Sequence, residues 1–140
     1  MQPEYGFSFL EILISLVLVS VASLGLYTIT ADIEVKQHNA LLAEGAMHIV
    51  NDQLDHWRLI NTDAPCTASH EEKIQLANIT GCLINTEDTP YQLEAKTTKT
   101  FTGVTGPYAK EIEAIVSWKD NRDVSQSLIF YFTASVYRHS

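Results

Sequence analysis

The chain has 140 residues, with 17 acidic and 9 basic side chains and a formal net charge of −8. Such an acidic chain is a poor candidate for general nucleic-acid binding, and its length allows one modest core but not two domains once an apolar N-terminal segment is set aside. Residues 32–90 hold ten acidic and three basic side chains, whereas residues 91–140 hold five and six. We therefore expect an acidic surface on the first part of the folded domain and a nearly neutral second part.

The N-terminal segment combines an uncharged apolar stretch with one carboxylate at its edge. Residues 12–31 carry no charge, and about 20 such residues suffice to cross the roughly 30 Å hydrocarbon layer as a helix. A secretory signal would begin with a basic region and end in a cleavage site after a shorter apolar core. Here no Lys or Arg precedes Lys36, and charged residues follow Ala31 directly. These features favour a retained membrane helix.

Glu11 lies at the edge of this span, where a carboxylate needs a partner because burying its charge is costly. The neighbouring sequence offers no cationic side chain. Cleavage after Gly6 would supply one, the free α-amino group of Phe7, four residues before Glu11. The alternative is an ordinary anchor in which Glu11 interacts only with the helix macrodipole. That interpretation leaves the run GFSFLE at residues 6–11 without a role.

Residues 6–11 and the apolar helix behind them resemble the N-terminus of type IV pilin and pseudopilin precursors. The resemblance implies that a membrane aspartyl peptidase cuts after Gly6 and that Phe7 becomes the N-methylated terminus. It also implies that Glu11 pairs with the terminus of a neighbouring subunit and sets the register of assembly. The leader in this family usually carries Lys or Arg, which hold the N-terminus inside. Residues 1–5 have neither, so either the native start differs or the assembly machinery sets the orientation.

The resemblance further implies the partners and the location of the chain. The partners would be other pilin subunits, which contact it through the N-terminal helix, the prepilin peptidase and the inner-membrane assembly platform; nucleic acid is not an expected partner. The chain would cross the bacterial inner membrane once, with its head in the periplasm, and then enter a pilus fibre or a periplasmic pseudopilus. We expect no cofactor, no bound metal and no enzymatic activity.

The leader is expected at residues 1–6 and the assembly helix at residues 7–31, and the pattern then predicts an amphipathic continuation over residues 32–60. Apolar residues recur at helical spacing from Leu41 to Trp57, with polar residues between them. Turn formers after residue 60 end the pattern. Major pilins often have a proline that breaks the membrane half of this helix, but this segment has none.

Residues 61–90 are predicted to connect the helix to a sheet. Ser69 and Glu72 form a capping box ahead of an apolar run, which predicts a helix of two turns that ends near Gly81. Cys66 and Cys82, the only cysteines, flank that helix, and in an oxidising compartment we expect a disulfide between them. Closing a loop of about 17 residues would stabilise the fold by roughly 3 kcal/mol.

Residues 91–140 change to the period of two that is typical of strands. The predicted elements are a strand at 91–98, a loop at 103–107, a strand through 112–118, a turn at 119–123 and a strand at 124–137. Both faces of the last strand are fairly apolar, which indicates a central place in the sheet. The expected fold class is therefore α+β, a long N-terminal helix packed on an antiparallel β-sheet, as in type IV pilins.

Other candidate sites have weaker support. Asp52, Asp55 and His56, with His48 nearby, lack defined metal-ligand spacing and are typical of a solvated helix face. Asn78 begins a three-residue glycosylation motif of low specificity. A DNA-binding patch would need the basic residues of the second half to gather, although acidic residues are interspersed among them: Lys96, Lys99, Lys110, Lys119 and Arg122.

The sequence therefore favours a minor type IV pilin, a structural subunit that joins or primes a pilus for adhesion, motility or DNA uptake. The run VSWKD at residues 116–120 is similar to minor pilins of the PilV type. One alternative is a minor pseudopilin of a type II secretion system, which has the same N-terminal chemistry. Another is an adhesin or DNA-binding module that is processed like a pilin, which a basic or aromatic patch on the head would favour.

Overall fold

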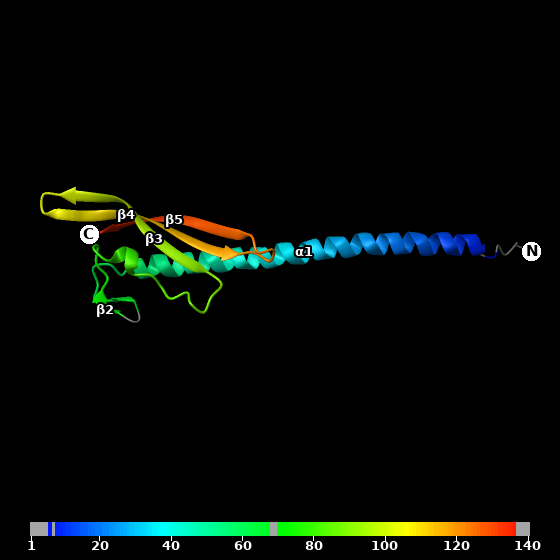
Figure 1. Ribbon diagram of the computed structural model, residues 1–140, viewed down its shortest axis with the longest axis horizontal. Coiled ribbons are helices and arrows are strands. Elements are labelled where there is room, and N and C mark those ends of the chain that lie inside the picture. The colour runs from blue at the N-terminus through cyan, green and yellow to red at the C-terminus, as the bar shows by residue number, and fades with distance from the viewer. Residues whose placement is uncertain (1–5, 7, 68–69, 137–140) are drawn as a thin grey trace, which may run out of the picture. The chain divides into compact units, whose positions relative to one another are not determined.

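The computed structural model describes Gly6, residues 8–67 and residues 70–136. The chain divides into two compact units, Met1–His38 and Asn39–Ser140. Figure 1 shows the elements, which in chain order are α1 (Phe9–Trp57), β1 (Pro65–Thr67), β2 (His70–Lys73), the 3-10 helix η1 (Ile79–Gly81), β3 (Gln92–Gly103), β4 (Gly106–Lys119) and β5 (Ser125–Ser135).

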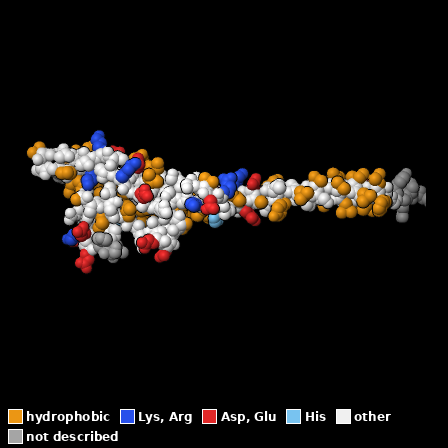
Figure 2. Space-filling view, viewed as in Figure 1, with side chains coloured by type: hydrophobic (Ala, Val, Ile, Leu, Met, Phe, Trp, Pro, Cys, Tyr) orange, Lys and Arg blue, Asp and Glu red, His pale blue; other side chains and the backbone are white. Residues whose placement is uncertain are grey.

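The first unit contains the N-terminal part of α1. This part is helical because it is rich in apolar residues and contains no proline, the strongest helix breaker. Its large apolar side chains are exposed, and Figure 2 shows them along the N-terminal part of the helix. In the described chain, α1 is the one helix that is long and apolar enough to cross a membrane by length and composition.

The second unit packs the rest of α1 against one face of a three-stranded antiparallel sheet in the order β3-β4-β5. The alternating pattern of β4 puts four apolar residues on the inner face, and all four are buried: Ile112, Ala114, Val116 and Trp118. Ala46, Val50 and Trp57 of α1 meet this face. The predicted α+β fold, with a long N-terminal helix packed on an antiparallel sheet, is confirmed.

The packing also shows in which direction each strand runs relative to α1. Ala46 and Val50 lie in one apolar cluster with Trp118 and Leu128, and Trp57 lies in another with Ile112 and Phe132. Residue numbers therefore rise together along α1 and β5 but in opposite senses along α1 and β4. Residues 39–57 of α1 run in the same direction as β5.

The connection between helix and sheet differs from the prediction. The capping-box helix is wrong: His70–Lys73 form strand β2, which pairs antiparallel with β1, while Ser69 lies outside the described residues. Ile74 and Leu76 are both buried and Gln75 between them is exposed, so this segment buries alternate residues instead of a helical face. α1 ends at Trp57, not at Ile60.

The predicted central position of the last strand is also wrong. The hairpins β3-β4 and β4-β5 follow one another along the chain, so the middle strand of the three, β4, takes the central place and β5 lies at an edge. The predicted loop at 103–107 is a tighter hairpin, in which Gly103 pairs with Gly106. Gly106 has a φ of +123°, a backbone conformation that residues other than glycine rarely adopt.

Candidate assembly site

The start of α1 places Glu11 in its first turn. The carbonyl of Ser8 accepts hydrogen bonds from the amides of Glu11 at 2.9 Å and Ile12 at 3.3 Å. A carboxylate at this position is favoured by the positive end of the helix macrodipole. The Glu11 side chain is exposed, and the ion pairs of the described residues do not include it. Its charge is therefore available to a cation from elsewhere.

The predicted cleavage site is only partly described by the structure. Gly6 is exposed and a Cβ added to it would meet nothing within 4 Å. Phe7 lies outside the described residues. Cleavage after Gly6, methylation of Phe7 and the register role of Glu11 thus stay predictions.

The serine and threonine hydroxyl groups in the apolar part of α1 are satisfied within the helix. Five of them donate to a carbonyl three or four residues earlier, at 2.7–2.9 Å: Ser15, Ser20, Ser23, Thr28 and Thr30. Such bonds remove the cost of placing hydroxyl groups in a medium without water. Over residues 8–31, Glu11 is the only acidic or basic side chain. This part of the helix is therefore an apolar surface with one charge near its start.

The C-terminal end of α1 holds the disulfide region through buried polar contacts. The predicted disulfide between Cys66 and Cys82 is present. The fully buried Gln53 side chain donates to the Cys82 carbonyl at 3.0 Å and accepts from the Ile84 amide at 2.8 Å. Trp57 Nε1 lies 3.0 Å from the carbonyl oxygen of Cys82 and also 3.0 Å from that of Ile79. These side chains fix the backbone after η1 against the helix.

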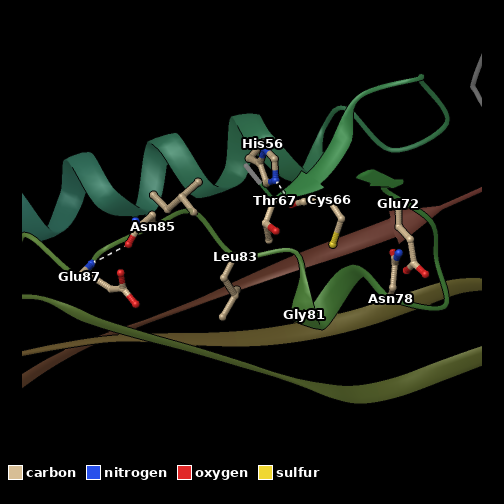
Figure 3. Close-up of a pocket in the computed structure, with 10 residues that line it drawn as sticks. His56, Cys66, Thr67, Glu72, Asn78, Gly81, Leu83, Asn85 and Glu87 are labelled. Carbon is tan, nitrogen blue, oxygen red and sulfur yellow. Dashed lines mark hydrogen bonds between the residues drawn. The ribbon is translucent and has the colours of Figure 1, made fainter. Parts of the chain in front are cut away.

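His56 contacts the other cysteine of the bridge. Its Nε2 lies 2.6 Å from the Cys66 carbonyl oxygen, and because a carbonyl only accepts, this nitrogen carries the proton. His56 lines an open groove of about 850 Å³ beside the disulfide loop, shown in Figure 3 with Glu72, Asn78 and Glu87.

Two of the candidate metal ligands on α1 have other partners. His56 contacts the Cys66 carbonyl, and Asp55 pairs with Arg58 at 2.6 Å. In the part of the chain that the structure describes, no group of three or more metal-ligating residues gathers.

Tyr91 joins the start of the sheet to α1 at a point where the helix has a glycine. Its hydroxyl donates to the Leu42 carbonyl at 2.8 Å, and burial raises its pKa. A Cβ on Gly45 would lie 2.0 Å from that hydroxyl oxygen. Only glycine at position 45 lets the tyrosine approach this closely. The Tyr91 ring also meets Trp118 edge-on, with ring centroids 6.1 Å apart.

The outer face of the sheet carries a chain of polar contacts across all three strands. Lys96 of β3 lies 2.8 Å from Glu113 of β4, and the Tyr131 hydroxyl of β5 donates to Glu113 at 3.0 Å. The hydrogen bond from Lys96 lowers the pKa of Glu113, and the same bond raises the pKa of Lys96. The hydrogen bond to Glu113 raises the pKa of Tyr131. Glu113 is thus held ionised between two donors.

The basic residues proposed for a DNA patch have individual contacts on the head. Lys96 pairs with Glu113, and Arg122 lies 3.8 Å from Asp120. Lys99 lies over the Phe101 ring, 4.8 Å from its centroid, and Lys110 contacts the Ala77 carbonyl at 3.4 Å. Two of the five positive charges are therefore offset by carboxylates.

The glycosylation motif also has an internal structural use. The Asn78 side chain accepts from the Gln75 amide at 2.8 Å and donates to the Lys73 carbonyl at 3.1 Å. Both ends of this amide therefore stabilise the turn that precedes η1.

The sequence predicted Glu11 and the cysteine pair as important residues but not the contacts of Gln53 or Gly45. One signal was available for Gln53, because it precedes Trp57 by four residues and so shares the buried face of α1. A glutamine on an apolar face needs internal partners. Gly45 gave no comparable signal, because its partner Tyr91 is far along the chain.

Comparison with known proteins gives one match. Residues 1–27 match the family described as the prokaryotic N-terminal methylation motif. No curated protein and no solved structure matches the chain. The match covers the segment that contains Gly6, Phe7 and Glu11 and does not extend into the head.

Proposed function

We propose that this chain, a type IV pilin-like or pseudopilin-like prepilin with an N-methylation motif, is a minor subunit of a type IV pilus. The motif implies processing by a prepilin peptidase and assembly into a pilus. In this proposal the peptidase cuts between Gly6 and Phe7, and Phe7 carries the methyl group. The subunit then leaves the inner membrane for the filament in low copy.

The observation that carries the proposal is Glu11, a single carboxylate in the first turn of an exposed apolar helix. In a bundle of such helices the charge would lie in a medium of low dielectric, where it needs a cation. The α-amino group of Phe7 from a neighbouring subunit would supply it. Pairing at one fixed place along the helix would set the axial position of each subunit, because the other side chains of this surface are uncharged.

Three features support a minor rather than a major subunit. No proline interrupts the helix between Pro3 and Pro65, unlike in many major pilins. The disulfide lies in the connection between helix and sheet, whereas many major pilins have theirs near the C-terminus. The similarity of residues 116–120 to minor pilins of the PilV type points the same way.

Processing is tested by changing the residue before the cut. Co-expression with a prepilin peptidase should yield a chain that begins at methylated Phe7, and Gly6→Val should remain uncut, which intact-mass analysis would show. Normal maturation of the Gly6→Val variant would refute the cleavage assignment.

Assembly is tested by Glu11→Ala. Deleting one partner of a buried ion pair costs about 3–5 kcal/mol, so the variant should be strongly depleted from sheared filaments. Membrane insertion should be normal or slightly better, because a charge is removed from the edge of the span. Quantitative blots of membrane and filament fractions, with Ser20→Ala as a control on the same helix, measure both. Unchanged recovery in filaments would mean that Glu11 does not set the register.

A minor pseudopilin of a type II secretion system is the second candidate, since Glu11 and the N-methylation motif serve both assemblies. The two are separated by deleting the gene in its native host. Loss of pili with normal protein secretion favours the pilus, and the reverse result favours the pseudopilus.

A further inference from the structure

An open pocket in the head is formed by segments that lie far apart in the sequence. Its volume is about 690 Å³, within the range of roughly 300–1,000 Å³ that is typical of small-molecule sites. All of its lining residues belong to the second unit. They come from the turn after α1, the end of β2 and the segment that follows it, the start of β4 and the residue after β5: Asn61, Thr62, residues 73–77, Pro107, Lys110 and Val136.

Much of the pocket wall is apolar. Ile74 and Leu76 are buried in the core of the head, and both also line the pocket. The more exposed residues Ala77, Pro107 and Val136 complete the apolar part of the lining. An apolar group bound here would leave water and contact side chains that the core already holds in place.

Lys110 brings a charge into this apolar surrounding. It lies on the same face of β4 as the buried residues Ile112 and Ala114, because side chains alternate along a strand, and it pairs across the sheet with the buried Ala134. Lys110 is half-buried, and its Nζ donates to the Ala77 carbonyl at 3.4 Å, longer than the usual 2.7–3.2 Å. The ion pairs of the described part of the chain do not include Lys110. Since an ammonium has three donors, this one can bind a further acceptor.

The charges that line the pocket favour an anionic ligand. Of the described residues in the lining, Lys73 and Lys110 are basic and none is acidic. Lys73 already pairs with Asp63 at 2.5 Å, which leaves the ammonium of Lys110 as the available positive charge. One ammonium beside apolar walls matches a carboxylate on an apolar body better than a phosphate, whose greater charge would lack a second cation.

We propose that this pocket binds a small organic carboxylate. The carboxylate accepts hydrogen bonds from Lys110 Nζ, and the apolar body of the ligand packs against Ile74, Leu76 and Val136. The site goes beyond the proposed function as a filament subunit, because all of its residues lie in the head and Glu11 has no part in it. It is the same whether the chain serves a pilus or a secretion pseudopilus.

NMR titration of the isotope-labelled full chain in a mild detergent tests the site, with benzoate as the probe. Benzoate should shift the backbone amides of residues 74–77 and Lys110 in a saturable manner. Benzamide has the same ring without the charge and should bind about tenfold more weakly, because it makes no charge-assisted hydrogen bond. The groove lined by Glu72 and Glu87 is an internal control, and the Glu87 amide should not shift. No shift at the pocket, equal binding of benzamide, or tighter binding of inorganic phosphate would overturn the proposal.

Variants of the lining provide the second measurement. Lys110→Gln should weaken benzoate binding by about tenfold, whereas Lys110→Arg keeps the charge and should retain binding. Lys99→Gln is the matched control: Lys99 lies over the Phe101 ring and does not line the pocket, so its loss should leave the affinity unchanged. Ala77→Phe fills the pocket from an exposed position and should abolish the shift at Lys110. The amide spectrum of the rest of the head shows that each variant is folded. Wild-type affinity in folded Lys110→Gln or Ala77→Phe would refute the site.

Discussion

Replacing Gly45 with alanine probes how closely the sheet approaches α1. The new Cβ would lie 2.0 Å from the Tyr91 hydroxyl oxygen and 2.9 Å from ring atom Cζ. Both distances are well inside van der Waals contact, so the tyrosine must move. Movement would break the 2.8 Å hydrogen bond to the Leu42 carbonyl and disturb the contact with the Trp118 ring.

The expected change in stability is a balance of opposing terms. The lost hydrogen bond removes about 1 kcal/mol, and forcing extra volume into a packed site costs about 1–3 kcal/mol. Alanine is a better helix former than glycine by about 1 kcal/mol. We therefore expect Gly45→Ala to lower the free energy of unfolding of the head by about 1–3 kcal/mol.

Urea unfolding of the full chain in a mild detergent, followed by tryptophan fluorescence, measures this change. Both tryptophans of the chain lie in the head, and Trp118 contacts Tyr91 directly. Gly81→Ala is a matched control, because its Cβ would meet nothing within 4 Å. In a Tyr91→Ala background, Gly45→Ala should be neutral or stabilising. Wild-type stability of the single variant, or equal destabilisation in both backgrounds, would refute the steric explanation.

Three further predictions concern the head. Gln53→Leu leaves the Ile84 amide without its partner and leaves the Cys82 carbonyl with Trp57 Nε1 as its remaining side-chain donor, so the free energy of unfolding should fall by about 1–3 kcal/mol in the same assay. Replacing Cys66 and Cys82 together by serine should lower it by about 3 kcal/mol, and reduction of the wild-type chain should match this loss. The amide of Arg122 holds the pKa of Asp120 below its ordinary value of 3.8, so this carboxylate stabilises the head above that pH and the contribution is lost as the pH falls further. Asp120→Asn should therefore flatten the dependence of stability on pH between about pH 5 and pH 2, measured by urea unfolding beside the unaltered chain.

The sequence alone determined the features whose signals are local. The apolar stretch of α1, the run at residues 6–11 and the change to strand period after Tyr91 each lie within one short window. Such patterns predict a helix, an apolar span or a strand directly, because side-chain periodicity follows backbone geometry. The disulfide was also predictable, since the chain has only two cysteines.

Tertiary structure decided the elements that depend on distant partners. Residues 70–73 include Glu72 of the predicted capping box, which indicated a helix. They form strand β2 instead, because β1 pairs with them. Gln53 and Cys82 are 29 residues apart, and Leu42 and Tyr91 are 49 apart; no local window contains either pair. The apolar sequence of β5 predicted a central strand, but the order of the hairpins places β5 at an edge, where Ile129 and Tyr131 are exposed. Pairing between strands is a contact between separate segments, so the sequence of one strand does not determine which strands lie beside it.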